Sequence, residues 1–373
     1  MGIERPKDER CPAMKLAVVA ITRQGSGLAG TVAGGLRTKG HEVRLLLPEA
    51  YAREGASILS VPLAEAAGGL FDAYDGLVMI MALGIVMRVL APHIRDKRTD
   101  PAVVVLDEGG GFVISALSGH LGGANDLARE LAGIIGALPV ITTATDVHGL
   151  GAVDVLARDY HLAMEPFEAV RGVNSALVNG GRVGLYTEYR LPEVPRGFIL
   201  MEEQNGPPVD WKVLITGRNL PPQGGRTLYL RPRNLVVGIG CRKGAGAGEI
   251  LDSIRESLKI LDKSPLCIKS LATVDLKVGE PGLKKAAASL GVPLLVYSRE
   301  DIKNIFDAGG AGLTFSPLVQ QKIGVGGVCE PVALLACPRG RLIMNKTKYP
   351  GITVAVAEES SGWWEPVQAR RSI

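Results

Sequence analysis

The sequence has few aromatic residues and no apolar run long enough to cross a membrane. Phe, Trp and Tyr make up 5% of the 373 residues, which weakens any model of nucleic-acid binding by base stacking. The longest apolar candidate, residues 76–90, contains Arg88 and is shorter than the roughly 18 residues that a spanning helix needs. Residues 1–13 are polar and lack the apolar core of a secretory signal. We therefore expect a cytoplasmic protein with neither a nucleic-acid nor a membrane partner.

Cysteine is also sparse, and its spacing excludes the usual thiol sites. The five cysteines are scattered and form no CxxC pair, so neither a disulfide framework nor a zinc site is predicted. The net charge is only +4, but residues 233–358 hold 17 Lys and Arg against 11 Asp and Glu. A basic segment attracts an anionic partner, although a solvated surface with a chance surplus of lysine explains it equally well.

Apolar runs alternate with helical patterns in the first and last thirds of the chain. Residues 15–21 and 102–106 predict buried strands, and the apolar spacing over 124–136 predicts an amphipathic helix. This alternation predicts mostly parallel sheets covered by helices on both faces, whereas the middle third holds short strand-like pieces between turns. We therefore expect an α/β fold, with two three-layer α/β/α lobes joined by a small β-rich middle segment. The expected parts are a disordered leader (1–13), an N-terminal α/β domain (14–145), a middle β-rich linking domain (146–232), a C-terminal α/β domain (233–358) and a tail (359–373).

A glycine pattern near the start has the form of a dinucleotide-binding motif. Gly25, Gly27 and Gly30 match GxGxxG after the first predicted strand. Residues 22–24 separate that strand from the first glycine, whereas the tight turn of the motif begins at the strand end. Nicotinamide binding is therefore a weak hypothesis, although the loop could hold an anion.

The densest group of chemically active residues follows the strand predicted at 102–106. A second short strand and the glycine-rich run SGHLGG then lead into the 124–136 helix. Ligands of open α/β sheets bind at the carboxyl ends of strands, where we expect these residues to lie. A turn cap and a structural histidine are the alternatives, but an acid, a hydroxyl and a histidine in one glycine-rich run favour function, with the amides of residues 122 and 123 as oxyanion donors. The catalytic candidates are His120 and Glu108, either of which could be the general base or acid, and Ser118. The substrate-binding candidates are Gly119, Gly122, Gly123, Asn125 and Asp126.

Further candidates follow later strands. Thr143 and Asp146 form either a hydrogen-bonding edge for a polar ligand or a helix N-cap. Arg242 and Lys243 lie in a glycine-rich loop and suit carboxylate or phosphate binding. Cys241 beside them is either a thiol of lowered pKa or a buried filler. The remaining candidates either line a pocket or form a structural salt bridge. They are Thr273, Lys277, Glu330 and Lys346.

These motifs resemble those of the cobalt-precorrin-5A hydrolase (CbiG) family of anaerobic cobalamin biosynthesis. The resemblance runs from about residue 14 to 358 and is most specific in DPAVVVLDEGG, SGHLGGAND and TTATDVHGLGAVD. It is also clear in VVGIGCRKG, LATVDLK and NKTKYPGITVAVAE of the last third. The sequence departs from the family at Cys329-Glu330-Pro331, where a small residue usually precedes the glutamate and alanine follows it.

The resemblance implies hydrolytic opening of the δ-lactone on the corrinoid ring of cobalt-precorrin-5A, with release of acetaldehyde to give cobalt-precorrin-5B. The cobalt belongs to the substrate, so no protein-held metal or other cofactor is expected. Many carboxylates decorate a corrinoid, which matches the basic last third, and we expect Arg242, Lys243 and Lys277 to anchor them. Besides this small-molecule substrate, we expect contacts with other enzymes of the cobalamin pathway. The alternative function is a non-catalytic corrinoid carrier.

Overall fold

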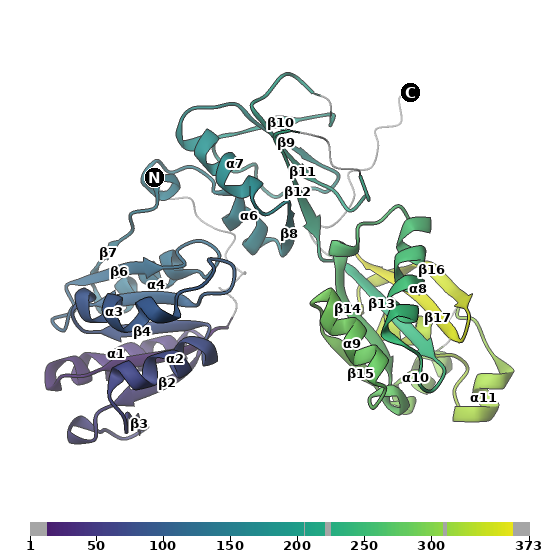
Figure 1. Cartoon of the computed structure of the whole chain (residues 1–373), viewed down its shortest axis with the longest axis horizontal. Coiled ribbons are helices and arrows are strands. Elements are labelled where there is room, and N and C mark those ends of the chain that lie inside the picture. The colour runs from purple at the N-terminus through teal and green to yellow at the C-terminus, as the bar shows by residue number, and fades with distance from the viewer. Residues whose placement is uncertain (1–12, 205, 221–224, 309–311, 361–373) are drawn as a thin grey trace. The chain divides into compact units, whose positions relative to one another are not determined.

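The computed structural model describes residues 13–204, 206–220, 225–308 and 312–360, and these form three sheets flanked by helices (Figure 1). The chain divides into two compact units, Met1–Val155 and Leu156–Ile373, with one sheet in the first unit and two in the second among the described residues. The predicted α/β class is confirmed. Residues 1–12 of the expected leader and 361–373 of the expected tail lie outside the described residues.

The first sheet has the strand order β3-β2-β1-β4-β5-β6-β7. Its strands are β1 Lys15–Ala20, β2 Glu42–Leu47, β3 Ala56–Ile58, β4 Gly76–Ile80, β5 Ala102–Leu106, β6 Phe112–Leu117 and β7 Leu138–Val140. Strands β1 to β5 pair in parallel, whereas β6 is antiparallel to β5, and β7 is parallel to β6. The carboxyl ends of β6 and β7 therefore lie at the edge of the sheet where β1, β4 and β5 begin.

Helices cover both faces of this sheet, which explains the uninterrupted apolar runs of its strands. The helices are α1 Arg23–Thr38, α2 Leu63–Ala73, α3 Leu83–Leu90, α4 Ala124–Ile135 and α5 Ala144–Val147, with 3₁₀ turns at Glu49–Tyr51 and Ala91–His93. Leu16 and Val18 of β1 pack in one core with residues of α1 and α4. Ala17 and Val19 point to the other face and pack in a second core with residues of α2 and α3.

The glycine pattern near the start, given only as a weak hypothesis for dinucleotide binding, does not form a phosphate-binding turn in the structure. Strand β1 ends at Ala20 and α1 begins at Arg23, so the three glycines of GxGxxG lie inside a helix instead of a loop. The side chain of Thr22 caps this helix by accepting a hydrogen bond from the N–H of Gly25 at 3.1 Å. The phosphate-binding turn that the motif needs is therefore replaced by ordinary helix capping.

The second unit begins with a sheet in the order β10-β9-β11-β12-β8. Its elements are α6 Val153–Asp159, which starts at the end of the first unit, β8 Leu162–Glu165, α7 Ala169–Val178, β9 Val183–Thr187, β10 Phe198–Met201, β11 Trp211–Ile215 and β12 Thr227–Pro232. Only β8 is antiparallel to its neighbour among the paired strands described here. The middle segment is β-rich as predicted, and its strands form a mostly parallel sheet accompanied by helices.

The last sheet has the order β15-β14-β13-β17-β16. Its strands are β13 Leu235–Cys241, β14 Ile268–Val274, β15 Leu294–Tyr297, β16 Gly340–Tyr349 and β17 Ile352–Glu359. The helices are α8 Ala247–Ile260, α9 Pro281–Leu290, α10 Arg299–Asp307, α11 Pro317–Ile323 and α12 Cys329–Leu335, with 3₁₀ turns at Pro265–Cys267 and Asp275–Lys277. Across the residues that the structure describes, no helix combines the length and apolarity that a bilayer crossing requires.

Candidate functional site

The carboxyl ends of β6 and β7 carry a connected group of polar side chains. His120, in the turn after β6, lies between two carboxylates. Its Nδ1 is 3.1 Å from Oδ1 of Asp154, and its Nε2 is 3.1 Å from Oδ2 of Asp146. The hydroxyl of Thr145 lies 3.2 Å from the same Nε2. Because both ring nitrogens face carboxylates, the arrangement favours the imidazolium, which has two N–H donors.

The two carboxylates determine the charge of His120. Burial of this side chain would by itself lower the pKa, but the hydrogen bonds and negative charges of Asp146 and Asp154 raise the pKa of His120 to about 9. Burial would likewise raise the pKa of Asp146, but hydrogen bonds from His120, Thr143 and Arg129 hold that pKa well below its usual range. At neutral pH the site therefore holds a cation between anions, and His120 is suited to donate a proton more than to accept one.

A buried amide holds Asp146 in place. Asn125, at the start of α4, is 3% exposed. Its Nδ2 donates to Oγ1 of Thr143 and to Oδ2 of Asp146, both at 2.9 Å, and its Oδ1 accepts from Oγ of Ser115 at 2.7 Å. Both polar atoms of Asn125 are thus engaged within the protein. We assign it to positioning Asp146, and not to the substrate contact that we expected from the sequence.

Charged side chains complete the group on its exposed side. Arg129 forms ion pairs with Asp126, at 3.0 Å, and with Asp146. The hydroxyl of Thr143 donates to Asp146 at 2.5 Å. Asp126, predicted to bind substrate, therefore holds an arginine one helical turn away on α4.

The turn that carries His120 is tightly packed and strained. A Cβ atom at position 119 would lie 2.6 Å from Oδ1 of Asn125, and one at position 122 would lie 2.5 Å from Cβ of Ser118, so both positions require glycine. Ser118 has a φ of +56°, which is unfavourable for a residue with a side chain. Its buried Oγ has no hydrogen-bond partner among the described residues. Strain and an unsatisfied hydroxyl in one turn are typical of functional sites.

The two amides predicted as oxyanion donors differ in whether their N–H groups are already hydrogen-bonded within the protein. The N–H of Gly123 donates to the carbonyl of His120 at 3.1 Å and so is already used within the turn. For the N–H of Gly122, no hydrogen bond is found within the described part of the chain. Gly122 also lines a cavity, which leaves it as the available donor of the pair.

Glu108 lies at the opposite edge of the sheet from His120, which corrects the prediction that they share one edge. Because β6 is antiparallel to β5, Leu117 at the end of β6 pairs with Val103 at the beginning of β5, whereas Glu108 follows the end of β5. The length of β5, at roughly 3.3 Å per residue, separates the two edges. Oε2 of Glu108 accepts a hydrogen bond from Oγ1 of Thr22 at 2.6 Å.

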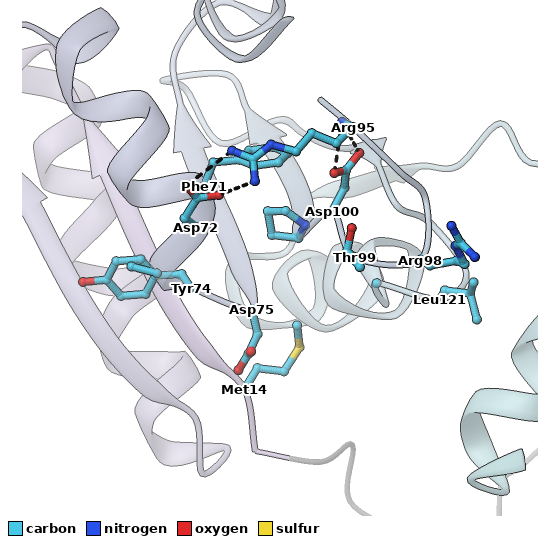
Figure 2. Close-up of a pocket in the computed structure, with 13 residues that line it drawn as sticks. Met14, Phe71, Asp72, Tyr74, Asp75, Arg95, Arg98, Thr99, Asp100 and Leu121 are labelled. Carbon is cyan, nitrogen blue, oxygen red and sulfur yellow. Dashed lines mark hydrogen bonds and ion pairs between the residues drawn. The ribbon is translucent and has the colours of Figure 1, made fainter. Parts of the chain in front are cut away.

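A cavity of 440 Å³ lies at the same edge of the sheet as the turn with His120 (Figure 2). Its walls come from the segments that precede β1, β4 and β5, together with Leu121 and Gly122 of the turn. This volume is within the range of small-molecule sites, which runs from roughly 300 to 1,000 Å³. A ligand in the cavity would therefore touch the glycine-rich turn that carries His120. The charged residues lining it are Asp72, Asp75, Arg95, Arg98 and Asp100.

The predicted carboxylate anchors of the last third are paired with glutamates in the second unit. Nη2 of Arg242 is 2.7 Å from Oε1 of Glu249, and Nζ of Lys277 is 3.2 Å from Oε1 of Glu280. The side chains of Arg242 and Glu249 are both about half exposed, so their ion pair contributes little to stability. A carboxylate from a ligand could therefore replace Glu249. Lys243 is exposed in the same loop.

Cys241 does not have the lowered pKa that its basic neighbours suggested. Burial of the thiol raises its pKa and outweighs the nearby charges of Lys277 and Arg242. The alternative that it is a partly buried filler at the end of β13 agrees with the structure.

Glu330, Lys346 and Thr273 have structural contacts. Glu330 is 1% exposed and accepts hydrogen bonds from N and Oγ1 of Thr314, at 2.7 and 2.9 Å, and from the backbone N of Lys346 at 2.9 Å. Glu330 thus accepts from two backbone N–H groups and one hydroxyl, in place of the salt bridge to a lysine that was one of the two alternatives. The buried hydroxyl of Thr273 donates to the carbonyl of Ile239 at 2.8 Å.

Two residues of the His120 group were not predicted from the sequence, namely Asp154 and Arg129. Arg129 follows Asp126 by three positions, and this spacing places two residues on one face of a helix. The ion pair between them could therefore have been predicted from the sequence. Asp154 is 34 positions from His120 and lies in α6, whereas His120 lies in the turn after β6, so no local spacing connects the two.

Three family models match successive parts of the chain. They are described as "Cobalamin synthesis G N-terminal" over residues 65–146, "Cobalamin biosynthesis central region" over 151–232 and "Cobalamin synthesis G C-terminus" over 235–357. All three sheets of the structure thus have residues that fall within a match.

Curated relatives match most of the chain. The cobalt-precorrin-5A hydrolase of Salmonella typhimurium is 37% identical over 349 residues, which cover 91% of this chain and 97% of that protein. The cobalt-precorrin-5A hydrolase of Priestia megaterium is 34% identical over 302 residues, covering 77% and 79%. Among solved structures, a cobalamin biosynthesis protein G homolog from Sulfolobus solfataricus is 22% identical, with a TM-score of 0.42 and coverage of 92% and 97%.

Proposed function

The chain belongs to the cobalt-precorrin-5A hydrolase family, and we propose that it opens the δ-lactone of cobalt-precorrin-5A and releases acetaldehyde to give cobalt-precorrin-5B. The full-length match to curated relatives of that name carries the choice of substrate. The His120 group and the adjoining cavity supply the chemistry that such a reaction needs.

Lactone opening places negative charge on the carbonyl oxygen as water attacks the carbonyl carbon. Preorganised hydrogen-bond donors stabilise such an oxyanion. We assign this role to the N–H of Gly122, which lines the cavity, and to the imidazolium of His120 in the same turn. Asp154 holds the ring through Nδ1 and so leaves Nε2 to approach the substrate when it exchanges its contact with Asp146.

The second step breaks a carbon–carbon bond in a retro-aldol manner. The hydroxyl that the lactone releases gives its proton to solvent water, the bond between its carbon and the macrocycle breaks, and the two-carbon fragment leaves as acetaldehyde. The conjugated macrocycle and its cobalt accept the electron pair, and a proton then restores the charge balance. We propose no protein-held cofactor for either step, since the cobalt is part of the substrate.

One feature of the site favours the alternative of a non-catalytic corrinoid carrier. Both nitrogens of His120 are already engaged, and a histidine in that state is also typical of a structural ion-pair network. A carrier would bind the substrate and the product without converting one into the other.

Incubation of the purified chain with cobalt-precorrin-5A distinguishes the two functions. We expect one acetaldehyde for each corrinoid consumed, with a net mass loss in the corrinoid equal to that of acetaldehyde minus the one water that opens the lactone. Binding of the corrinoid by the folded chain without acetaldehyde would support the carrier and reject the hydrolase.

A further inference from the structure

An arginine is fixed at the rim of the cavity through its backbone. The N–H of Arg95 lies 3.2 and 3.1 Å from the two carboxylate oxygens of Asp100, as Figure 2 shows. Asp100 is 6% exposed and precedes β5, so it anchors the Arg95 backbone to the sheet. The guanidinium of Arg95 therefore extends from a fixed point at the cavity rim.

The guanidinium is occupied by a carboxylate that is easily exchanged. Nη1 of Arg95 is 3.1 Å from Oδ1 of Asp72, near the end of α2, and Nη2 is 3.4 Å from Oδ2 (Figure 2). The side chains are 62% and 56% exposed. Exposed ion pairs contribute little to stability, so a carboxylate from a ligand can replace Asp72 at little cost. A guanidinium also binds a carboxylate through two parallel hydrogen bonds, which suits this exchange.

The rest of the cavity offers both apolar and charged surface to a ligand that carries carboxylate arms. Met14, Phe71 and Leu121 supply apolar surface. The carboxylate of Asp75 already accepts the N–H of Lys15 at 2.8 Å, so part of the negative charge in the cavity is engaged. Arg98 places a second guanidinium on the lining, paired with Asp96.

We propose that Arg95 binds a peripheral carboxylate of the corrinoid and that Asp72 occupies the guanidinium in the free protein. The identity of the ligand rests on the proposed function, whereas the exchange itself rests on the exposed pair and the cavity. Asp72 thus competes with the ligand, and the two members of one ion pair have opposite effects on binding.

The test measures how a variant of each member of the pair changes the binding of a corrinoid that does not react. Cobyrinic acid, a cobalt corrinoid whose side arms are free carboxylates, is titrated against the chain and followed by its visible absorbance. We expect Arg95→Gln to weaken binding about tenfold, in line with the loss of a charge-assisted pair. Asp72→Asn removes the competitor and should tighten binding. The methyl ester of the same corrinoid should respond to neither variant.

Arg255 and Asp252 on α8 provide a matched control, because they form an equally exposed pair at 2.9 Å far along the sequence. Arg255→Gln and Asp252→Asn should both leave the dissociation constant unchanged. Shifts of Arg95→Gln and Asp72→Asn in the same direction, no shift in either, or no binding of cobyrinic acid to the wild-type chain would overturn the proposal. If the wild-type chain yields no acetaldehyde but the opposite shifts are found, the hydrolase function fails while the carboxylate site stands.

Discussion

At the scale of single residues, His120 is defined by the carboxylates on either side of its ring. Asp146 and Asp154 each lie 3.1 Å from one ring nitrogen. Their combined effect exceeds the cost of burial and keeps the ring charged at neutral pH. The same contacts that suit His120 to donate a proton therefore also stabilise the fold.

This coupling predicts a pH dependence of stability. Folding raises the pKa of His120 from 6.5 to about 9. The contribution of His120 to the free energy of unfolding is therefore fully present below pH 6.5 and is lost as the pH rises through 9. The pKa shift corresponds to about 3 kcal/mol in the free energy of unfolding. Urea unfolding of the wild-type chain and of His120→Gln at pH 6 and pH 10 measures this contribution. Equal losses of stability in both proteins between these pH values would contradict the assignment.

The sequence revealed part of this site because its residues are close together in the chain. The run from Ser118 to Asp126 combines glycines, a histidine and a helix start, and this local pattern was sufficient to select His120. Asp154 was missed because the contact depends on how α6 packs, which no spacing within one element determines.

At the scale of elements, the packing of α12 on β13 depends on a glycine. A Cβ atom at Gly238 would lie 1.9 Å from the carbonyl oxygen of Cys329, so the helix lies against the bare backbone of the strand. Gly248, in α8, has nothing within 4 Å of the corresponding position. These two glycines form a matched pair for substitution.

We expect Gly238→Ala to destabilise the second unit by about 2–3 kcal/mol, because the helix must move off the strand. Gly248→Ala should be neutral or stabilising by up to about 1 kcal/mol, since alanine is the better helix former. Chemical denaturation of both variants gives the comparison. A similar stability for Gly238→Ala and the wild-type chain would show that the close contact is not needed.

The elements themselves were largely predictable, and one error was avoidable. The runs 15–21 and 102–106 agree with β1 and β5, because buried parallel strands have continuous apolar sequences. The direction of β6 was missed, although only five residues separate it from β5 and a parallel crossover needs a dozen or more. That connection length already predicts an antiparallel pair, which places Glu108 and His120 at opposite edges.

At the scale of the whole molecule, backbone pairing joins the two sheets of the second unit. The N–H of Ser264 donates to the carbonyl of Gly217 at 2.9 Å, and the N–H of Asn219 donates to the carbonyl of Asp262 at 3.0 Å. Arg231 of β12, which is 1% exposed, supports this junction.

Arg231 is the side chain whose loss should loosen the junction most clearly. Its Nη1 donates to the carbonyls of Thr216 and Arg218, at 3.3 and 2.5 Å, and its Nε donates to Glu165 at 3.0 Å. We expect Arg231→Gln to lower the free energy of unfolding by about 2–3 kcal/mol, because buried carbonyls lose their donor. The amide of Ser264 should then exchange its hydrogen faster, whereas Arg226→Gln, at an exposed position before β12, should change neither quantity. Unchanged protection of Ser264 in Arg231→Gln would contradict this role.

We propose that the reaction takes place at the edge of the first sheet where His120 lies. The initial rate of acetaldehyde release from cobalt-precorrin-5A tests this location. If the site is correct, His120→Ala lowers this rate by about 10²-fold or more, as expected for a group that donates to the reacting oxygen. Glu108→Gln, at the opposite edge, leaves the rate essentially unchanged. A rate that falls with Glu108→Gln and persists with His120→Ala would place the chemistry at the other edge.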